Sequence, residues 1–94
     1  MTLEFEWDQG KATANVHKHG VSFEEAITIF SDPNAITIAD AEHSDAEDRF
    51  VDIGLSANGR VLVVVHTERG RSVRIISCRK ATPAERSQYE QQVI

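Results

Sequence analysis

Residues 61–82, VLVVVHTERGRSVRIISCRKAT, form two apolar, β-branched runs on either side of a short polar turn. Near-continuous apolar runs of this length are typical of strands covered on both faces, and Arg69-Gly70 marks the turn between them. The stretch therefore predicts a hairpin at the centre of a sheet. It also carries His66, Arg74 and Arg79-Lys80, which a purely structural hairpin would not need.

Three helices are expected around this hairpin, because a capping residue precedes each stretch of helical spacing. The first two helices stop at Gly20 and at Asp32-Pro33, and Pro83 favours the start of the third. The capping residues are Asp8, Ser22 and Thr82, and the helices cover 9–19, 22–32 and 83–91.

Strands are expected where apolar residues alternate or run together, over 3–7, 35–39, 49–56, 60–67 and 72–80. Asn58-Gly59 predicts a two-residue turn between the third and fourth of them. The order β-α-α-β-β-β-β-α predicts an α+β fold, with an antiparallel central sheet flanked by helices. A length of 94 residues predicts a single domain over 1–94.

Composition limits the setting in which the chain acts. No apolar run approaches the 18–20 residues of a membrane span, and the N-terminus lacks the pattern of a signal peptide. Cys78 is the only cysteine, so an internal disulfide is excluded, and its apolar neighbours predict a buried, unreactive thiol. We therefore expect a cytoplasmic protein with no membrane contact.

Charge is distributed unevenly along the chain. The net charge is −5, which argues weakly against a general nucleic-acid binder. Residues 1–59 nevertheless hold twelve Asp/Glu and three Lys/Arg, whereas residues 60–94 hold three and seven. The C-terminal third can therefore form a local basic patch that attracts phosphate.

Two blocks of the sequence resemble the BrnT toxin family, within the wider RelE/ParE-like superfamily. The first block is Phe5-Glu6-Trp7-Asp8, Lys11, Asn15 and the run KHGVSFEEA over 18–26. The second is EDRF over 47–50, Ile53-Gly54, VVVH over 63–66, RIIS over 74–77, RKAT over 79–82, and Glu85.

The resemblance implies a RelE-like fold and a small ribonuclease toxin. It implies a BrnA-like partner, a ribbon-helix-helix antitoxin that neutralises the toxin, and a pair that binds operator DNA and represses its own operon. Related RelE-like nucleases cut RNA without a metal, so no metal or other cofactor is expected. Two other functions stay open: a non-catalytic antitoxin-binding module and a ParE-like toxin directed at gyrase.

Metal-free cleavage uses the RNA's own 2′-hydroxyl as nucleophile, and it needs a proton carrier and cations. His66 is the first candidate for the proton carrier, because its pKa lies nearest neutrality. Glu68 would share the face of His66 and could orient the imidazole or act as the base. The alternative for Glu68 is a solvated turn residue paired with Arg71.

Cations on and near the hairpin are the candidates for binding the phosphate. Arg74 is either a phosphate clamp or one half of a buried ion pair, and Arg79 is the preferred phosphate ligand at the strand end. Further RNA contacts are expected from Lys80, Arg49 and Lys18. Lys18 also fits a structural role at a helix C-terminus, where the dipole favours cations.

Hairpin register decides which of these groups meet. A two-residue turn at Arg69-Gly70 would place His66 opposite Val73 and on one face with Arg79. A three-residue turn would pair His66 with Arg74 instead. The sequence leaves both registers open.

The sequence gives weaker indications for Trp7, for the loop around His43 and for the surface that contacts the antitoxin. Trp7 is expected to anchor the core, and His43 is expected in a solvated loop, although Asp40, Glu42 and Asp45 could join it around a metal. For the antitoxin we expect the acidic segment 40–48, a sheet edge or the last helix, through Tyr89 and Val93, as contact surfaces.

Overall fold

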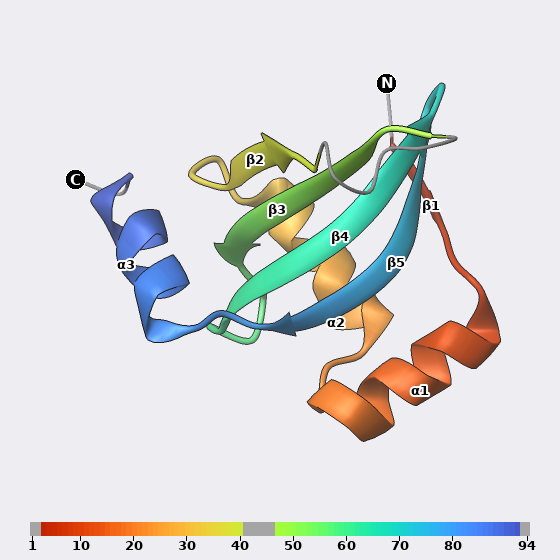
Figure 1. Ribbon diagram of the computed structural model, residues 1–94, viewed down its shortest axis with the longest axis horizontal. Coiled ribbons are helices and arrows are strands. Elements are labelled where there is room, and N and C mark those ends of the chain that lie inside the picture. The colour runs from red at the N-terminus through yellow and green to blue at the C-terminus, as the bar shows by residue number, and fades with distance from the viewer. Residues whose placement is uncertain (1–2, 41–46, 93–94) are drawn as a thin grey trace.

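The computed structural model describes residues 3–40 and 47–92. The elements along the chain are β1 (Glu4–Glu6), α1 (Gln9–His19), α2 (Phe23–Ala26), the 3₁₀ helix η1 (Ile27–Ser31), β2 (Ile36–Ala39), β3 (Arg49–Leu55), β4 (Val61–Arg69), β5 (Ser72–Lys80) and α3 (Pro83–Gln91). The predicted α+β fold is confirmed (Figure 1). Within the described residues, no helix has the length and apolar character that a membrane span requires.

The five strands form one sheet in the order β1-β5-β4-β3-β2. Strands β2 to β5 pair with one another in antiparallel fashion, as expected for the centre of the sheet. β1 adds to the edge in parallel with β5, which makes the sheet mixed. The hairpin β4–β5 therefore has a neighbour on each side, in agreement with its apolar character.

The predicted capping residues begin the helices. Asp8 accepts a hydrogen bond from the Lys11 amide at 2.9 Å, and Ser22 accepts one from Glu25 at 3.0 Å. Thr82 opens α3 with a complete capping box. The second helix differs from the expectation, because its α-helical part is short and it continues as η1.

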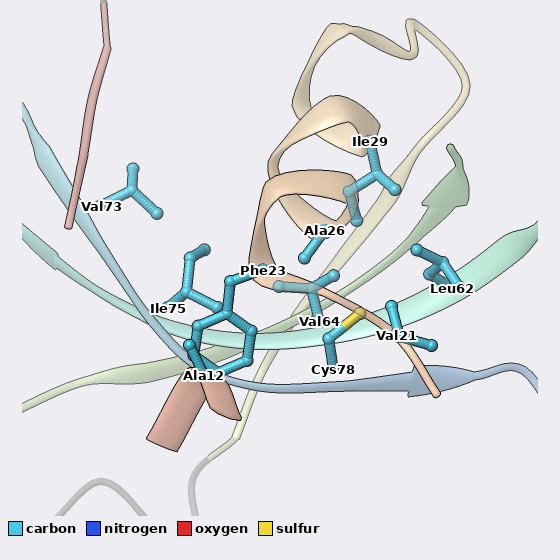
Figure 2. Packing of buried hydrophobic residues seen from close by; sticks show 10 residues of the cluster. All are labelled: Ala12, Val21, Phe23, Ala26, Ile29, Leu62, Val64, Val73, Ile75 and Cys78. Carbon is cyan, nitrogen blue, oxygen red and sulfur yellow. The ribbon is translucent and has the colours of Figure 1, made fainter. Parts of the chain in front are cut away.

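Figure 2 shows the main core, in which α1 and α2 pack on one face of the sheet. Its buried members come from α1, the α1–α2 connection, α2, η1, β4 and β5, and they are Ala12, Val21, Phe23, Ala26, Ile29, Leu62, Val64, Val73, Ile75 and Cys78. Trp7 packs edge-on against Phe23 with ring centroids 5.8 Å apart, so its predicted place in the core is confirmed. Burial raises the pKa of Cys78 to about 12, as expected for an unreactive thiol.

The side chain of Asn15 links α1 to the C-terminal half of β5, which has no pairing with β1. Its amide donates to the carbonyl of Cys78 at 2.8 Å and accepts from the Cys78 amide at 3.1 Å. The same side chain donates to the carbonyl of Val21 at 2.9 Å. Because β1 pairs only with residues 72–74 of β5, this buried amide satisfies backbone groups that would otherwise lack a partner.

Both hairpin turns differ from their predicted forms. The β3–β4 connection is a three-residue loop, since the Ser56 amide donates to the Arg60 carbonyl at 2.8 Å, and Gly59 has φ 78°. The β4–β5 turn consists of Gly70 and Arg71, with Gly70 at φ 60°. A glycine with positive φ at the first central position suits a two-residue hairpin turn.

The register of the central hairpin is consequently neither of the two expected ones. His66 pairs with Ile75, not with Val73 or Arg74, and Thr67 pairs with Arg74. An irregularity between Val65 and His66 then shifts the register by one residue, because Val65 pairs with Ser77 and Ile76 is left without a partner on β4. An extra residue of this kind changes which side chains share a face at the two ends of a strand.

Candidate functional site

The sheet has one face covered by helices and one that is largely open. Successive residues of a strand point to opposite faces, and paired residues on neighbouring strands share a face. His66 lies on the face that α1 and α2 cover, which we call the helix face. Val65 and Thr67 lie on the opposite face, which we call the open face because, among the described elements, only α3 packs on it, at one end (Figure 1).

The register places Arg49 of β3, Thr67 of β4 and Arg74 of β5 side by side on the open face. We call these three residues the arginine row. Thr67 is 4% exposed, and its Oγ1 has no hydrogen-bond partner within the described residues. A buried hydroxyl without a partner is costly, and an oxyanion held between two guanidinium groups would provide one.

Carboxylates partly neutralise the arginine row. Arg74 Nη1 lies 3.9 Å from Glu6 Oε2, and Arg49 also interacts with neighbouring groups. Beside the row, Arg69 binds Glu47 through two hydrogen bonds of 2.6 and 2.8 Å, which hold the pKa of Glu47 below its usual value. Such exposed pairs contribute little to stability and are open to competition from a phosphate.

The helix face carries a second group of polar residues, formed by Asp52, His66 and Glu68. His66 Nε2 lies 3.2 Å from Glu68 Oε2, and its Nδ1 lies 3.8 Å from Asp52 Oδ2. His66 is 1% exposed, whereas the Glu68 side chain is 53% exposed. Burial raises the pKa of Asp52, against the opposing effects of a hydrogen bond from Thr37 and the nearby His66. The imidazole thus lies between a buried and an exposed carboxyl group.

Aromatic rings enclose the imidazole. Phe50 stacks on His66 with ring centroids 5.5 Å apart, and Phe30 meets it edge-on at 5.2 Å. These rings leave only Glu68 as an exposed member of the group. The structure therefore brings His66 and Glu68 together, but it places His66 on the opposite face from the arginine row.

The other predicted cations lie elsewhere. Arg79 is five residues from Arg74 on β5, about 16 Å along the strand, and it binds Glu85 through hydrogen bonds of 2.7 and 2.9 Å. This pairing lowers the pKa of Glu85 to about 2. Lys80 is exposed at the end of β5, and Lys18 is exposed in the last turn of α1, on the helix side of the sheet.

Thr67 and Asp52 are candidate site residues that the sequence-based analysis did not identify. Thr67 lies within the predicted strand but offers little signal, since threonine is common in sheets. Asp52 gives a clearer signal, because its charge interrupts the apolar pattern of RFVDIGL. The metal expectation around His43 lies largely outside the described residues, as does the contact expected from Val93.

The fold is shared with a solved ribonuclease toxin. The crystal structure of BrnT from Brucella abortus matches with a TM-score of 0.66 and 24% identity, over 86% of this chain and 99% of that chain. A model of the family described as ribonuclease toxin, BrnT, of type II toxin-antitoxin systems matches residues 7–85. The chain therefore belongs to the BrnT family of ribonuclease toxins, whose members act together with an antitoxin. A search of curated proteins found no match.

Proposed function

We propose that this ribonuclease toxin cuts RNA internally and without a metal ion, with the scissile phosphate bound at the arginine row. The observation that carries the location is the buried Thr67 hydroxyl, which lacks a partner between Arg49 and Arg74 within the described chain. Two guanidinium groups beside a hydroxyl donor suit a phosphodiester whose negative charge grows during the reaction.

Chemistry at this site needs a group that accepts the 2′-hydroxyl proton. Glu68 follows Thr67 at the outer end of β4 and is exposed, but its side chain lies on the helix face, opposite the arginine row. In our proposal the scissile nucleotide therefore wraps around the hairpin end, with its phosphate at the row and its 2′-hydroxyl toward Glu68. In our proposal Glu68 takes the proton, O2′ bonds to phosphorus and the P–O5′ bond breaks. The leaving 5′-oxygen takes up a proton from water, and the products are a 2′,3′-cyclic phosphate and a 5′-hydroxyl.

His66 acts in this scheme as a positioning residue. Its burial between Phe30 and Phe50 fixes the ring, so the contact at 3.2 Å fixes the Glu68 carboxylate in turn. A general base must be held within hydrogen-bond reach of the proton it removes. Arg79 is already bound to Glu85, and Lys18 lies on the helix side, so neither contacts the scissile phosphate in this proposal.

For the partner, we propose a BrnA-like ribbon-helix-helix antitoxin that binds operator DNA together with this chain and represses their operon. Membership of a type II toxin-antitoxin family supports an antitoxin partner. We further propose that both proteins act in the cytoplasm, where the RNA substrate is found. The lone buried Cys78 is consistent with a reducing compartment.

Cleavage of RNA by the purified, antitoxin-free protein in EDTA tests the proposed reaction. We expect 3′ fragments with a 5′-hydroxyl and 5′ fragments with a cyclic phosphate, and no cleavage of an RNA that carries 2′-O-methyl groups throughout. Intact RNA, from a protein whose circular dichroism shows it to be folded, would contradict the proposal. Cleavage only after addition of Mg²⁺ would contradict its metal-free form.

A further inference from the structure

A cavity opens at the other end of the central strands, between α3 and the β3–β4 loop. It has a volume of about 370 Å³ and is lined by Leu55, Gly59, Arg60, Val61, Lys80, Arg86, Tyr89 and Glu90. Ligand pockets begin at roughly 300 Å³, so this one has room for about one nucleotide. Three of its lining residues are cations and one is a carboxylate.

Two of these cations differ from most others in the structure. Arg60, Arg69, Arg74 and Arg79 each form an ion pair with a glutamate. Within residues 3–40 and 47–92, neither Lys80 nor Arg86 has an ion pair or a side-chain hydrogen bond, yet both line the same cavity. Two exposed cations that converge without a carboxylate partner are available to bind an anion.

The remaining walls suit the rest of a nucleotide. Leu55 is an exposed apolar residue at the rim, and Val61 supplies a second apolar contact for a base or a sugar. Arg60 is held by Glu25, and the Tyr89 hydroxyl donates to Asp32 at 2.5 Å, so these two walls are fixed in place. The cavity is therefore built from rigid side chains apart from Lys80, Arg86 and Glu90.

We infer that this cavity is a second RNA subsite, which binds a phosphate with Lys80 and Arg86 and the attached nucleoside against Leu55 and Val61. The inference rests on the proposed function, because it places a second part of the same RNA strand. Val61 and Thr67 are six residues apart on β4, about 20 Å along the strand. An RNA of several nucleotides can therefore contact the cavity and the arginine row at once.

Binding of a ten-nucleotide, 2′-O-methyl RNA tests the subsite without cleavage, because this RNA has no free nucleophile. By fluorescence anisotropy, Lys80→Ala/Arg86→Ala should weaken binding about tenfold and reduce the slope of log K against log salt by about 0.7, the value for one lost phosphate contact on a single strand. The matched control, Lys11→Ala/Arg71→Ala, removes one exposed cation of α1 and one of the β4–β5 turn, both outside the cavity, and should change affinity less than twofold.

Equal weakening by both double variants would show that affinity follows net charge, and it would overturn the inference. Unchanged affinity in Lys80→Ala/Arg86→Ala, or loss of antitoxin binding alone, would overturn it as well. Cleavage of unmodified RNA is measured separately. If the wild-type protein cuts no RNA but binds the 2′-O-methyl RNA through the cavity, the subsite is supported and the proposed reaction is contradicted. If the wild-type protein cuts RNA and the Lys80→Ala/Arg86→Ala variant binds RNA with full affinity, only the subsite is overturned.

Discussion

His66 is buried between two phenylalanine rings, yet its Nε2 atom lies 3.2 Å from a carboxylate that is exposed to solvent. A buried imidazole cannot meet RNA directly, but it can fix the orientation of Glu68. On its other side it faces Asp52, whose Oδ1 has no hydrogen-bond partner among the described residues. His66 Nδ1 also lacks a hydrogen-bond partner there, and buried polar atoms without partners cost stability.

Asp52→Asn should separate stability from activity. Because the pKa of Asp52 is raised in the folded protein, the native state binds its proton more tightly and wild-type stability falls as pH rises above about 4. Asn at this position cannot ionise and so avoids this loss. The free energy of unfolding of the variant at pH 7 should therefore exceed that of the wild type, and the two should converge near pH 4.

Urea unfolding at pH 4 and pH 7, together with a pH profile of RNA cleavage, measures both effects. Cleavage by Asp52→Asn should fall about tenfold with a shifted profile, since the partner of His66 has lost its charge. A variant that is less stable than the wild type at pH 7, or that cuts RNA with an unchanged profile, would contradict the role given to Asp52.

Helix α3 is held to the rest of the fold by one side-chain contact near each of its ends. Glu85 completes the capping box with Thr82 and also binds Arg79 of β5. Further along the helix, Tyr89 donates to Asp32, and burial together with this bond raises the pKa of Tyr89 to about 12. The helix therefore depends on ion pairing at one end and on a buried aromatic ring at the other.

Glu85→Gln should destabilise the protein in a pH-dependent way. The folded-state pKa of Glu85 is about 2, below the ordinary value of 4.5, so its contribution is complete above pH 4.5 and is lost as pH falls toward 2. We expect a loss of about 1 kcal/mol at pH 7, since the pair is partly exposed, and convergence with the wild type near pH 2.

The matched control for this change is Glu90→Gln, an exposed glutamate of the same helix with no ion pair in the described part of the chain. Thermal or urea unfolding between pH 2 and pH 7 compares the three proteins. A constant difference between Glu85→Gln and the wild type across this range would show that the ion pair contributes nothing through its charge.

Elements were easier to predict from the sequence than their alignment. Capping residues and apolar runs specify where helices and strands begin, because they act over a few neighbouring residues. Register depends on the turn, and here Gly70 occupies the first turn position while a bulge follows Val65. Neither feature has a distinct sequence signal, so the partners of His66 could not be predicted.

The distribution of cations over the protein follows from this register. Sequence alone suggested one basic pocket beside His66. The structure instead groups Arg49 with Arg74 at one end of the open face, and it places Lys80 and Arg86 around a cavity at the other end. Folding also pairs Arg79 with Glu85, a contact that depends on how α3 returns to the sheet and has no local signal.

Between these two groups lies an apolar stretch of the open face. Ile38, Val51 and Val65 follow one another across β2, β3 and β4, and Ile38 is 48% exposed. An RNA strand that contacts both basic groups would cross this stretch. Sugar and base surfaces suit it better than phosphates do, so the basic ends would fix the strand while the middle of the face accepts its less polar parts.

The cleavage rate of Arg74→Ala tests the central claim most directly, namely that the arginine row binds the scissile phosphate. Its control is Arg71→Ala, which removes an exposed arginine three positions away in the hairpin turn. We predict that Arg74→Ala lowers kcat/KM about 100-fold, while Arg71→Ala stays within threefold of the wild type and both remain folded. Wild-type cleavage by folded Arg74→Ala would contradict the account.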